Sequence, residues 1–153
     1  MSLAGTLDVG FYHCTRAPAA EVAVRLAAKA HETGKRLLIV SDPARLQALD
    51  KALWTADPDS FLPHAQAGGA DDAEQPILLA EAVTAANGAR ILLLVEHGLP
   101  QALDGFERVL NLFEEGGEGQ VQARSDWKAL LDREGLTRSY WQQKEGGGWE
   151  KRG

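Results

Sequence analysis

Two short stretches of this 153-residue sequence contain only aliphatic side chains, and they constrain the fold more than any other feature. One is Leu37–Val40 (LLIV), and the other lies within Arg90–Glu96 (RILLLVE). Both are far shorter than the ~20 residues that a membrane-spanning helix needs. An unbroken apolar run of this length is typical of a parallel strand that is buried on both faces of its sheet. The chain is therefore expected to cover a central sheet from both sides.

Amphipathic segments alternate with these strands and are expected to form helices that pack on the faces of the sheet. A helix is expected to begin at Pro18, whose missing N–H suits a first turn, and to end at Gly34. A second helix is expected from the start signal Ser41-Asp42-Pro43 to Trp54. The other expected elements are a third helix at 120–134, a short helix at 100–106, strands at 7–13, 77–79, 109–113 and 136–143, and a long surface loop at 55–75.

This alternation predicts the fold class α/β, with three layers and a mainly parallel central sheet that carries helices on both faces. We expect one domain at residues 1–145, followed by a flexible Gly-rich tail at 146–153. Trp149 in that tail is interpreted either as a loosely docked hydrophobe or as part of a disordered end.

Neither strand end carries a phosphate-binding loop, which needs glycines between a strand and the helix that follows it. The first expected strand leads into HCTRAPAAE and the second into SDPARLQ, and neither segment contains glycine. The Gly34-Lys35 pair follows a helix and precedes a strand, which is the wrong order. We therefore predict a Rossmann-like sheet that lacks a phosphate-binding loop and has no cofactor.

The residue types that commonly perform catalysis or bind metals are scattered along the chain. His13 and Cys14 are neighbours on an expected strand, so their side chains should point to opposite faces. His31, His64 and His97 show no i, i+4 spacing, and a single cysteine excludes both a disulfide within the chain and a Cys-based zinc site. We predict that the protein is not an enzyme. An α/β enzyme or a nucleotide-binding protein of unknown substrate is the alternative.

The charge balance bears on partners and location. A net charge of −6 argues against a surface that binds nucleic acid directly. The start of the sequence, MSLAGTLDVG, lacks the charged and apolar regions of a signal peptide, and one cysteine suits a reducing compartment. A cytoplasmic protein without a membrane segment is expected.

The late helix, expected at 120–134, carries a mixed cationic and apolar side. Helical spacing places Arg124, Lys128 and Leu131 together on it. Trp127 borders that side, and Gln120 projects one turn earlier. One interpretation is a solvated basic edge above a core tryptophan. The other is a pocket for an acidic peptide with an apolar end, in which an arginine pairs with a carboxylate and the aromatic ring buries the end.

A second aromatic pair lies in the segment 49–68. Trp54 is at the end of an expected helix, and Phe61 is in the long loop that follows. The pair either covers the core or anchors a protein partner, since aromatic side chains are frequent interface hot spots.

Several segments, taken in order, resemble one known family. They are Gly34-Lys35-Arg36 before an apolar strand, 49–54 (LDKALW), 59–64 (DSFLPH), the pair Phe11-Tyr12, and the late-helix pairs Ala123-Arg124 and Trp127-Lys128. Together they resemble the chi subunit of bacterial DNA polymerase III holoenzyme over most of the chain. Residues 49–64 are the most specific part, whereas residues 69–86 depart from the family pattern.

The resemblance implies a non-catalytic accessory subunit of the clamp-loader complex, with a nucleotide-binding-like fold and no nucleotide. Such subunits bind the acidic, Phe-terminated C-terminal tail of single-stranded DNA-binding protein and, where it exists, a psi subunit. They thereby link the clamp loader to coated template. The implied partners are that tail and a psi subunit or another holoenzyme or helicase partner, with DNA contacted only indirectly. The chain would be a monomer or part of a heterodimer.

The resemblance also carries residue roles by position. Arg124, Trp127 and Lys128 match the tail-binding helix of the family. The candidate tail-binding set adds Phe113 on the preceding strand and the helix residues Gln120 and Leu131. Trp127 stands where the family pattern has tyrosine, and Gln120 stands where a basic residue would strengthen binding. Trp54 and Phe61 match the aromatics on the psi side.

Overall fold

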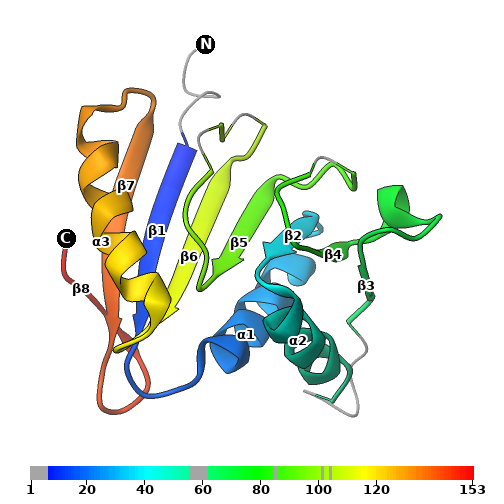
Figure 1. The fold of residues 1–153 in the computed structure, drawn as a ribbon, viewed down its shortest axis with the longest axis horizontal. Helices are drawn as coiled ribbons and strands as arrows, with labels where there is room; N and C mark the ends of the chain where they lie inside the picture. Colours follow the sequence, from blue (N-terminus) through cyan, green and yellow to red (C-terminus); the bar gives the residue numbers. More distant parts are fainter. Residues whose placement is uncertain (1–6, 56–61, 85, 101, 104) are drawn as a thin grey trace.

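The computed structural model describes residues 7–55, 62–84, 86–100, 102–103 and 105–153. Helices and strands alternate along most of this length (Figure 1). The elements are β1 (Leu7–Cys14), α1 (Ala19–Glu32), β2 (Leu37–Val40), α2 (Pro43–Thr55), β3 (His64–Gln66), β4 (Ile77–Ala80), β5 (Ile91–Val95), β6 (Arg108–Glu114), α3 (Glu118–Ala129), β7 (Leu136–Gln143) and β8 (Trp149–Lys151), with short 3₁₀ turns at Asp72–Glu74 and Leu130–Asp132.

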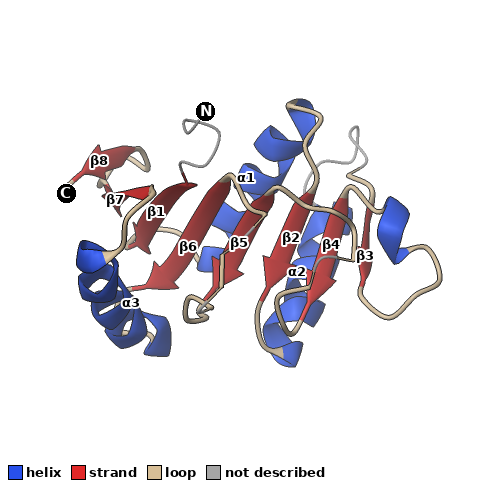
Figure 2. Ribbon diagram, turned by 90° about the horizontal axis from the view of Figure 1, so that it is seen from above, coloured by secondary structure: helices blue, strands red, loops and turns tan. Residues whose placement is uncertain are grey.

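The strands form one eight-stranded sheet in the order β3-β4-β2-β5-β6-β1-β7-β8. Figure 2 shows this row from above, with β8 and β3 at its two ends. Neighbouring strands are parallel from β3 to β7, and β8 alone pairs antiparallel, with β7. The sheet is therefore mainly parallel, as the sequence predicts.

The unbroken apolar strands are buried on both faces because each face has its own core. Alternate residues such as Ile39 and Leu93 pack with α1 and α2. Their neighbours Leu38 and Leu92 belong to the core on the opposite face, which includes residues of α3. Figure 1 shows α3 at the β7–β1 end of the sheet and the other two helices toward the β2 end. The predicted three-layer α/β class is confirmed.

The expected helix at 100–106 is wrong, because none of its described residues is helical. Leu103 is buried and Phe106 packs against the same core, so their helix-like apolar spacing comes from a loop that lies on the sheet. Gly105 has φ 89°, a left-handed conformation that favours glycine and ends a regular turn.

Two further segments differ from expectation. The strand β3 lies inside the stretch expected to be a loop, where it pairs with β4 at one edge of the sheet. At the other edge, residues of the expected flexible tail form β8. The glycines before it build a hairpin turn, in which Gly147 has φ 93° and its N–H donates to the Lys144 carbonyl at 2.8 Å.

Within the described ranges, none of the helices combines the length and the apolar character that crossing a bilayer requires.

Candidate functional site

A pocket of about 370 Å³ lies between α3 and the β7–β8 hairpin. Three of its lining residues come from the predicted tail-binding set: Arg124, Trp127 and Lys128. Helix α3 brings them together because successive turns place them on the side that faces the hairpin. The pocket therefore combines cations and an aromatic surface.

Trp127 is half-buried and is held in place by neighbours on several sides. Its ring meets Phe11 edge to face at 5.4 Å and Tyr140 at 5.7 Å between ring centroids. The Arg138 guanidinium lies 3.8 Å from the ring centroid, and its Nη1 donates to the Trp127 carbonyl at 2.5 Å. The ring is thus rigidly placed, and it still lines the pocket.

Tyr140 on β7 forms another part of the lining. Burial raises the pKa of its hydroxyl, and the nearby cation Arg124 partly opposes that shift. The hydroxyl therefore stays protonated at neutral pH. It lies 3.4 Å from His13 Nδ1, and His13 Nε2 in turn lies 2.6 Å from Glu115 Oε2.

The other members of the predicted tail-binding set lie outside the pocket lining. Phe113 is fully buried on β6, where its ring is 6.0 Å from that of Tyr140. Gln120 is also buried, and its Oε1 accepts a hydrogen bond from the Gly116 N–H at 2.8 Å. Leu131 is 62% exposed in the 3₁₀ turn after α3. Phe113 and Gln120 support the pocket indirectly. Phe113 packs against the ring of Tyr140, and Gln120 holds the turn before α3.

Three lining residues were not predicted from the sequence: Tyr140, Arg152 and Gly153. Tyr140 and Arg152 come together because β7 and β8 pair, and the N–H of Arg152 donates to the Tyr140 carbonyl at 2.7 Å. The available signal was the hairpin sequence KEGGGWEK, in which glycines separate two segments with strand composition.

The predicted partner surface lies at the other end of the sheet. Trp54, near the end of α2, is 56% exposed, and its ring meets that of His64 on β3 at 4.9 Å. His64 Nδ1 lies 2.7 Å from the Leu62 carbonyl oxygen, which fixes this ring, and His64 Nε2 lies 3.1 Å from Asp50 Oδ1 on α2. Phe61 lies outside the described residues.

The N-terminus of each of the three described α-helices, where a Rossmann-like fold binds phosphate, already holds a carboxylate of the chain itself. Glu114 Oε2 accepts from the Ala19 N–H of α1 at 2.7 Å. Asp42 Oδ1 accepts from the Arg45 N–H of α2 at 2.9 Å. Glu96 Oε2 accepts from the Gly119 N–H of α3 at 2.6 Å. An anion brought to any of these positions would meet a negative charge.

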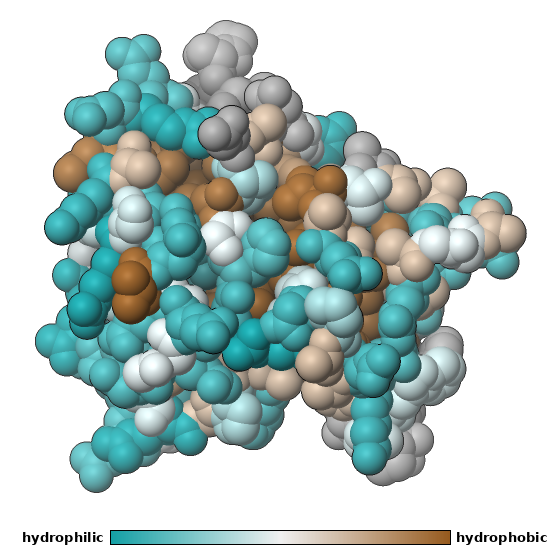
Figure 3. Space-filling model, in the orientation of Figure 1, coloured by the Kyte–Doolittle hydropathy of each residue, from teal (hydrophilic) through white to brown (hydrophobic). Residues whose placement is uncertain are grey.

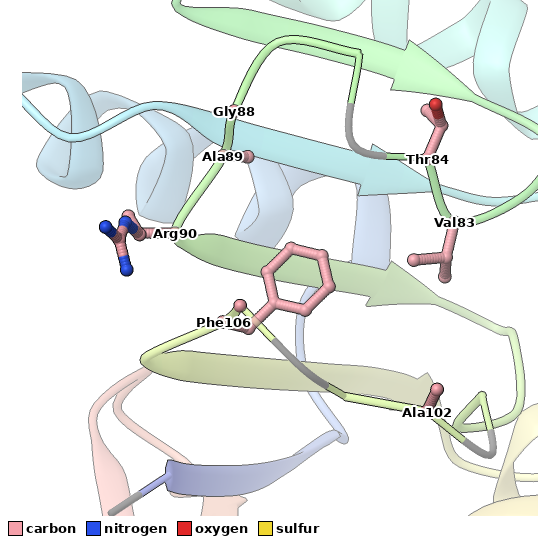
Figure 4. A pocket seen from close by; sticks show the side chains of 8 residues that line it. Val83, Thr84, Gly88, Ala89, Arg90, Ala102 and Phe106 are labelled. Atoms are coloured by element: carbon pink, nitrogen blue, oxygen red, sulfur yellow. The ribbon is translucent and has the colours of Figure 1, made fainter. Parts of the chain in front are cut away.

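A larger pocket of about 530 Å³ lies over the core on the α3 side of the sheet. Figure 4 shows the Phe106 ring in its middle, Val83 and Ala102 toward one end, and the Arg90 side chain at the other end. Figure 3 shows apolar surface in the upper middle of the same side of the molecule. Among the described residues that line this pocket, Arg90 is the charged one, and most of the others are small or apolar.

His13 and Cys14 do not form a catalytic pair. Cys14 belongs to the core beneath α1 and α2, whereas the His13 ring stacks on Phe113 of the opposite core at 5.1 Å. Burial, with smaller contributions from Glu114 and Glu96, raises the pKa of the Cys14 thiol to about 12. Among the described residues, no group of three or more His, Cys, Asp or Glu side chains is placed to hold a metal ion.

The fold and its sites define a class of protein: an α/β domain with a mainly parallel sheet, whose helix N-termini hold carboxylates of the chain itself and whose charged pocket lies beside an outer helix. Comparison with known proteins gives the family. The family model for the DNA polymerase III chi subunit, HolC, matches residues 7–137, and the chain belongs to this family. Chi is an accessory subunit and not itself a catalytic enzyme.

Two curated relatives agree with this assignment. The DNA polymerase III subunit chi of Haemophilus influenzae is 29% identical over 112 residues, which cover 72% of this chain and 78% of the relative. The subunit chi of Pseudomonas aeruginosa is 33% identical over 109 residues, which cover 71% of this chain and 75% of the relative. The family resemblance noted in the sequence is confirmed.

Proposed function

We propose that this chi-family subunit binds the acidic, Phe-terminated tail of single-stranded DNA-binding protein in the pocket between α3 and the β7–β8 hairpin. In doing so it links that protein to the clamp loader of the DNA polymerase III holoenzyme. The observation that carries the proposal is the convergence of Arg124, Trp127 and Lys128 on one pocket.

The chemistry of the pocket suits a peptide terminus. A guanidinium pairs with a carboxylate through two parallel hydrogen bonds, so Arg124 is the preferred partner of the terminal carboxylate. Trp127 and Tyr140 offer ring surface to an aromatic end group. At about 370 Å³ the pocket is at the small end of the ~300–1,000 Å³ range of ligand sites, which suits one side chain and its backbone.

Local charge makes the site selective in an acidic protein. The net charge of −6 repels nucleic acid and other anions over most of the surface. The cations Arg124, Lys128 and Arg152 line the same pocket, so an acidic segment is attracted there. Because these side chains are exposed, binding should weaken as salt screens them. Contact with DNA is proposed to be indirect, through the bound protein.

A second partner is proposed at Trp54. A large aromatic side chain that is 56% exposed beside a fixed histidine has the character of an interface anchor. A psi subunit, or another holoenzyme or helicase partner, would bind here.

The experiment is a calorimetric titration with a peptide of the last ten residues of the host's single-stranded DNA-binding protein. Arg124→Ala and Lys128→Ala should each weaken binding by about tenfold, because each removes a hydrogen bond to a charged group worth roughly 1.5 kcal/mol. Arg25→Ala on α1 removes an exposed arginine from the opposite face of the sheet and serves as control.

A peptide with its final Phe replaced by Ala tests the apolar part of the pocket, and it should bind at least about tenfold more weakly. Unchanged affinity in both α3 variants would refute the proposed site. A direct shift of bare single-stranded DNA by the purified protein would contradict indirect contact.

A further inference from the structure

The β7–β8 hairpin forms the wall of the pocket that faces α3. In the antiparallel register Trp141 pairs with Lys151, so Tyr140 and Arg152 are opposite each other and share a face of the sheet. Both line the pocket, and the N–H of Tyr140 also donates to the Gly153 carbonyl at 3.2 Å. The end of β8 is thus fixed by backbone hydrogen bonds beside Trp127.

Arg152 is a cation that an incoming acidic peptide can recruit. Its Nη2 lies 3.7 Å from Glu150 Oε2, and both side chains are about half exposed. An exposed pair at this distance contributes little, so exchanging Glu150 for a carboxylate of a ligand costs little. Among the residues that line the pocket, Arg124 and Lys128 come from the helix and Arg152 comes from the end of the hairpin, while Arg138 of β7 stacks on the Trp127 ring outside this lining.

Gly153 lies directly beside the edge of the Trp127 ring. A Cβ at this position would lie 3.2 Å from Trp127 Cζ2 and 3.6 Å from Tyr140 Cβ. Any side chain longer than a methyl group would therefore extend along the ring and into the space that the pocket provides.

We propose that β8 and the two residues after it contribute directly to peptide binding. Arg152 binds an acidic residue upstream of the peptide's apolar end, and the absence of a side chain at Gly153 leaves space for the peptide beside Trp127. This inference rests on the proposed function and extends it to a specificity-determining residue. The match to the family model covers residues 7–137, so β8 lies outside the matched part of the chain.

The test compares Arg152→Ala with Lys151→Ala in the titration with the same ten-residue peptide. Lys151 is adjacent on β8, and its side chain is on the opposite face, so this variant removes the same charge away from the pocket. Arg152→Ala should bind roughly 2- to 5-fold more weakly and with a smaller salt dependence, whereas Lys151→Ala and Arg152→Lys should match the unmodified protein.

Gly153→Leu tests the entrance. It should weaken binding by at least about tenfold without changing the unfolding temperature, since residue 153 follows the last strand. If Arg124→Ala weakens binding while Arg152→Ala and Gly153→Leu do not, residues 152 and 153 do not contribute to peptide affinity. The inference is then overturned, although the proposed function stands. If the unmodified protein does not bind the peptide, the proposed function fails and the inference fails with it.

Discussion

Replacing Gly119 with alanine should destabilise the fold, because the Glu96 carboxylate occupies the space that the added methyl group would need. The Glu96 carboxylate accepts from the N–H groups of Gly119 and Glu114, both at 2.6 Å. A Cβ on Gly119 would overlap Oε2 of this carboxylate and lie 3.0 Å from Glu96 Cα. Glu96 itself has φ 51°, a conformation that a non-glycine residue keeps only when its surroundings hold it. The carboxylate must therefore leave the start of α3.

The magnitude follows from the bonds that are lost. A hydrogen bond to a charged group contributes about 1.5–3 kcal/mol, and the carboxylate makes two. The higher helix propensity of alanine offsets about 1 kcal/mol. We expect a net loss of about 2–5 kcal/mol, which for a chain of this length lowers the unfolding temperature by roughly 4–20 °C.

Urea unfolding followed by circular dichroism measures this loss. Gly146→Ala is the matched control, because a Cβ there meets nothing within 4 Å. In the Glu96→Ala background the carboxylate is gone and the tight contact with the residue 96 Cα at 3.0 Å remains, so adding Gly119→Ala should cost clearly less than it does in the unmodified protein. A Gly119→Ala protein as stable as the unmodified one, or two costs that simply add, would refute the reasoning.

Three further outcomes are expected. Trp127→Ala should abolish detectable peptide binding and lower the free energy of unfolding by about 2–3 kcal/mol, whereas Trp127→Tyr should keep binding within about threefold; titration and urea unfolding measure both. Trp54→Ala should lower the free energy of unfolding by about 1–2 kcal/mol, because it removes the ring contact with His64, and should leave peptide affinity unchanged; it should weaken capture of a purified psi subunit, and equal capture would contradict the second surface. Cys14 should react with a thiol reagent at pH 8 only after unfolding, and its stabilising contribution should be lost as the pH rises from 9.0 toward about 12, because burial raises its folded-state pKa.

The sequence predicts the central strands because every residue in them is apolar, and an unbroken apolar run indicates a strand buried on both faces. Leu37–Val40 and Ile91–Val95 are apolar throughout, and both lie where neighbours cover each face. The helix predicted at 100–106 was wrong because a loop packed on a sheet can have the same spacing of buried side chains as an amphipathic helix. Strand β3 was missed because three residues give no period, and its pairing with β4 comes from a distant segment.

The sequence predicted only the residues that α3 contributes to the pocket, because the other lining residues come from distant segments. Arg124, Trp127 and Lys128 come together through local helical geometry, which spacing alone defines. Arg152 joins them through the register of a hairpin, and Phe11 supports Trp127 from a strand at the other end of the chain. Contacts between segments so far apart depend on topology that local patterns do not specify.

The order of the strands has a mechanical consequence. Strand β8 borders the peptide pocket and β3 borders Trp54, and these two strands close opposite ends of the row. With neighbouring strands ~4.8 Å apart, the two surfaces are separated by roughly 30 Å of hydrogen-bonded sheet. If both proposed partners bind, they would lie too far apart to collide, and the hydrogen-bonded strands between them would connect the two surfaces. The domain would then hold those two partners about one sheet width apart.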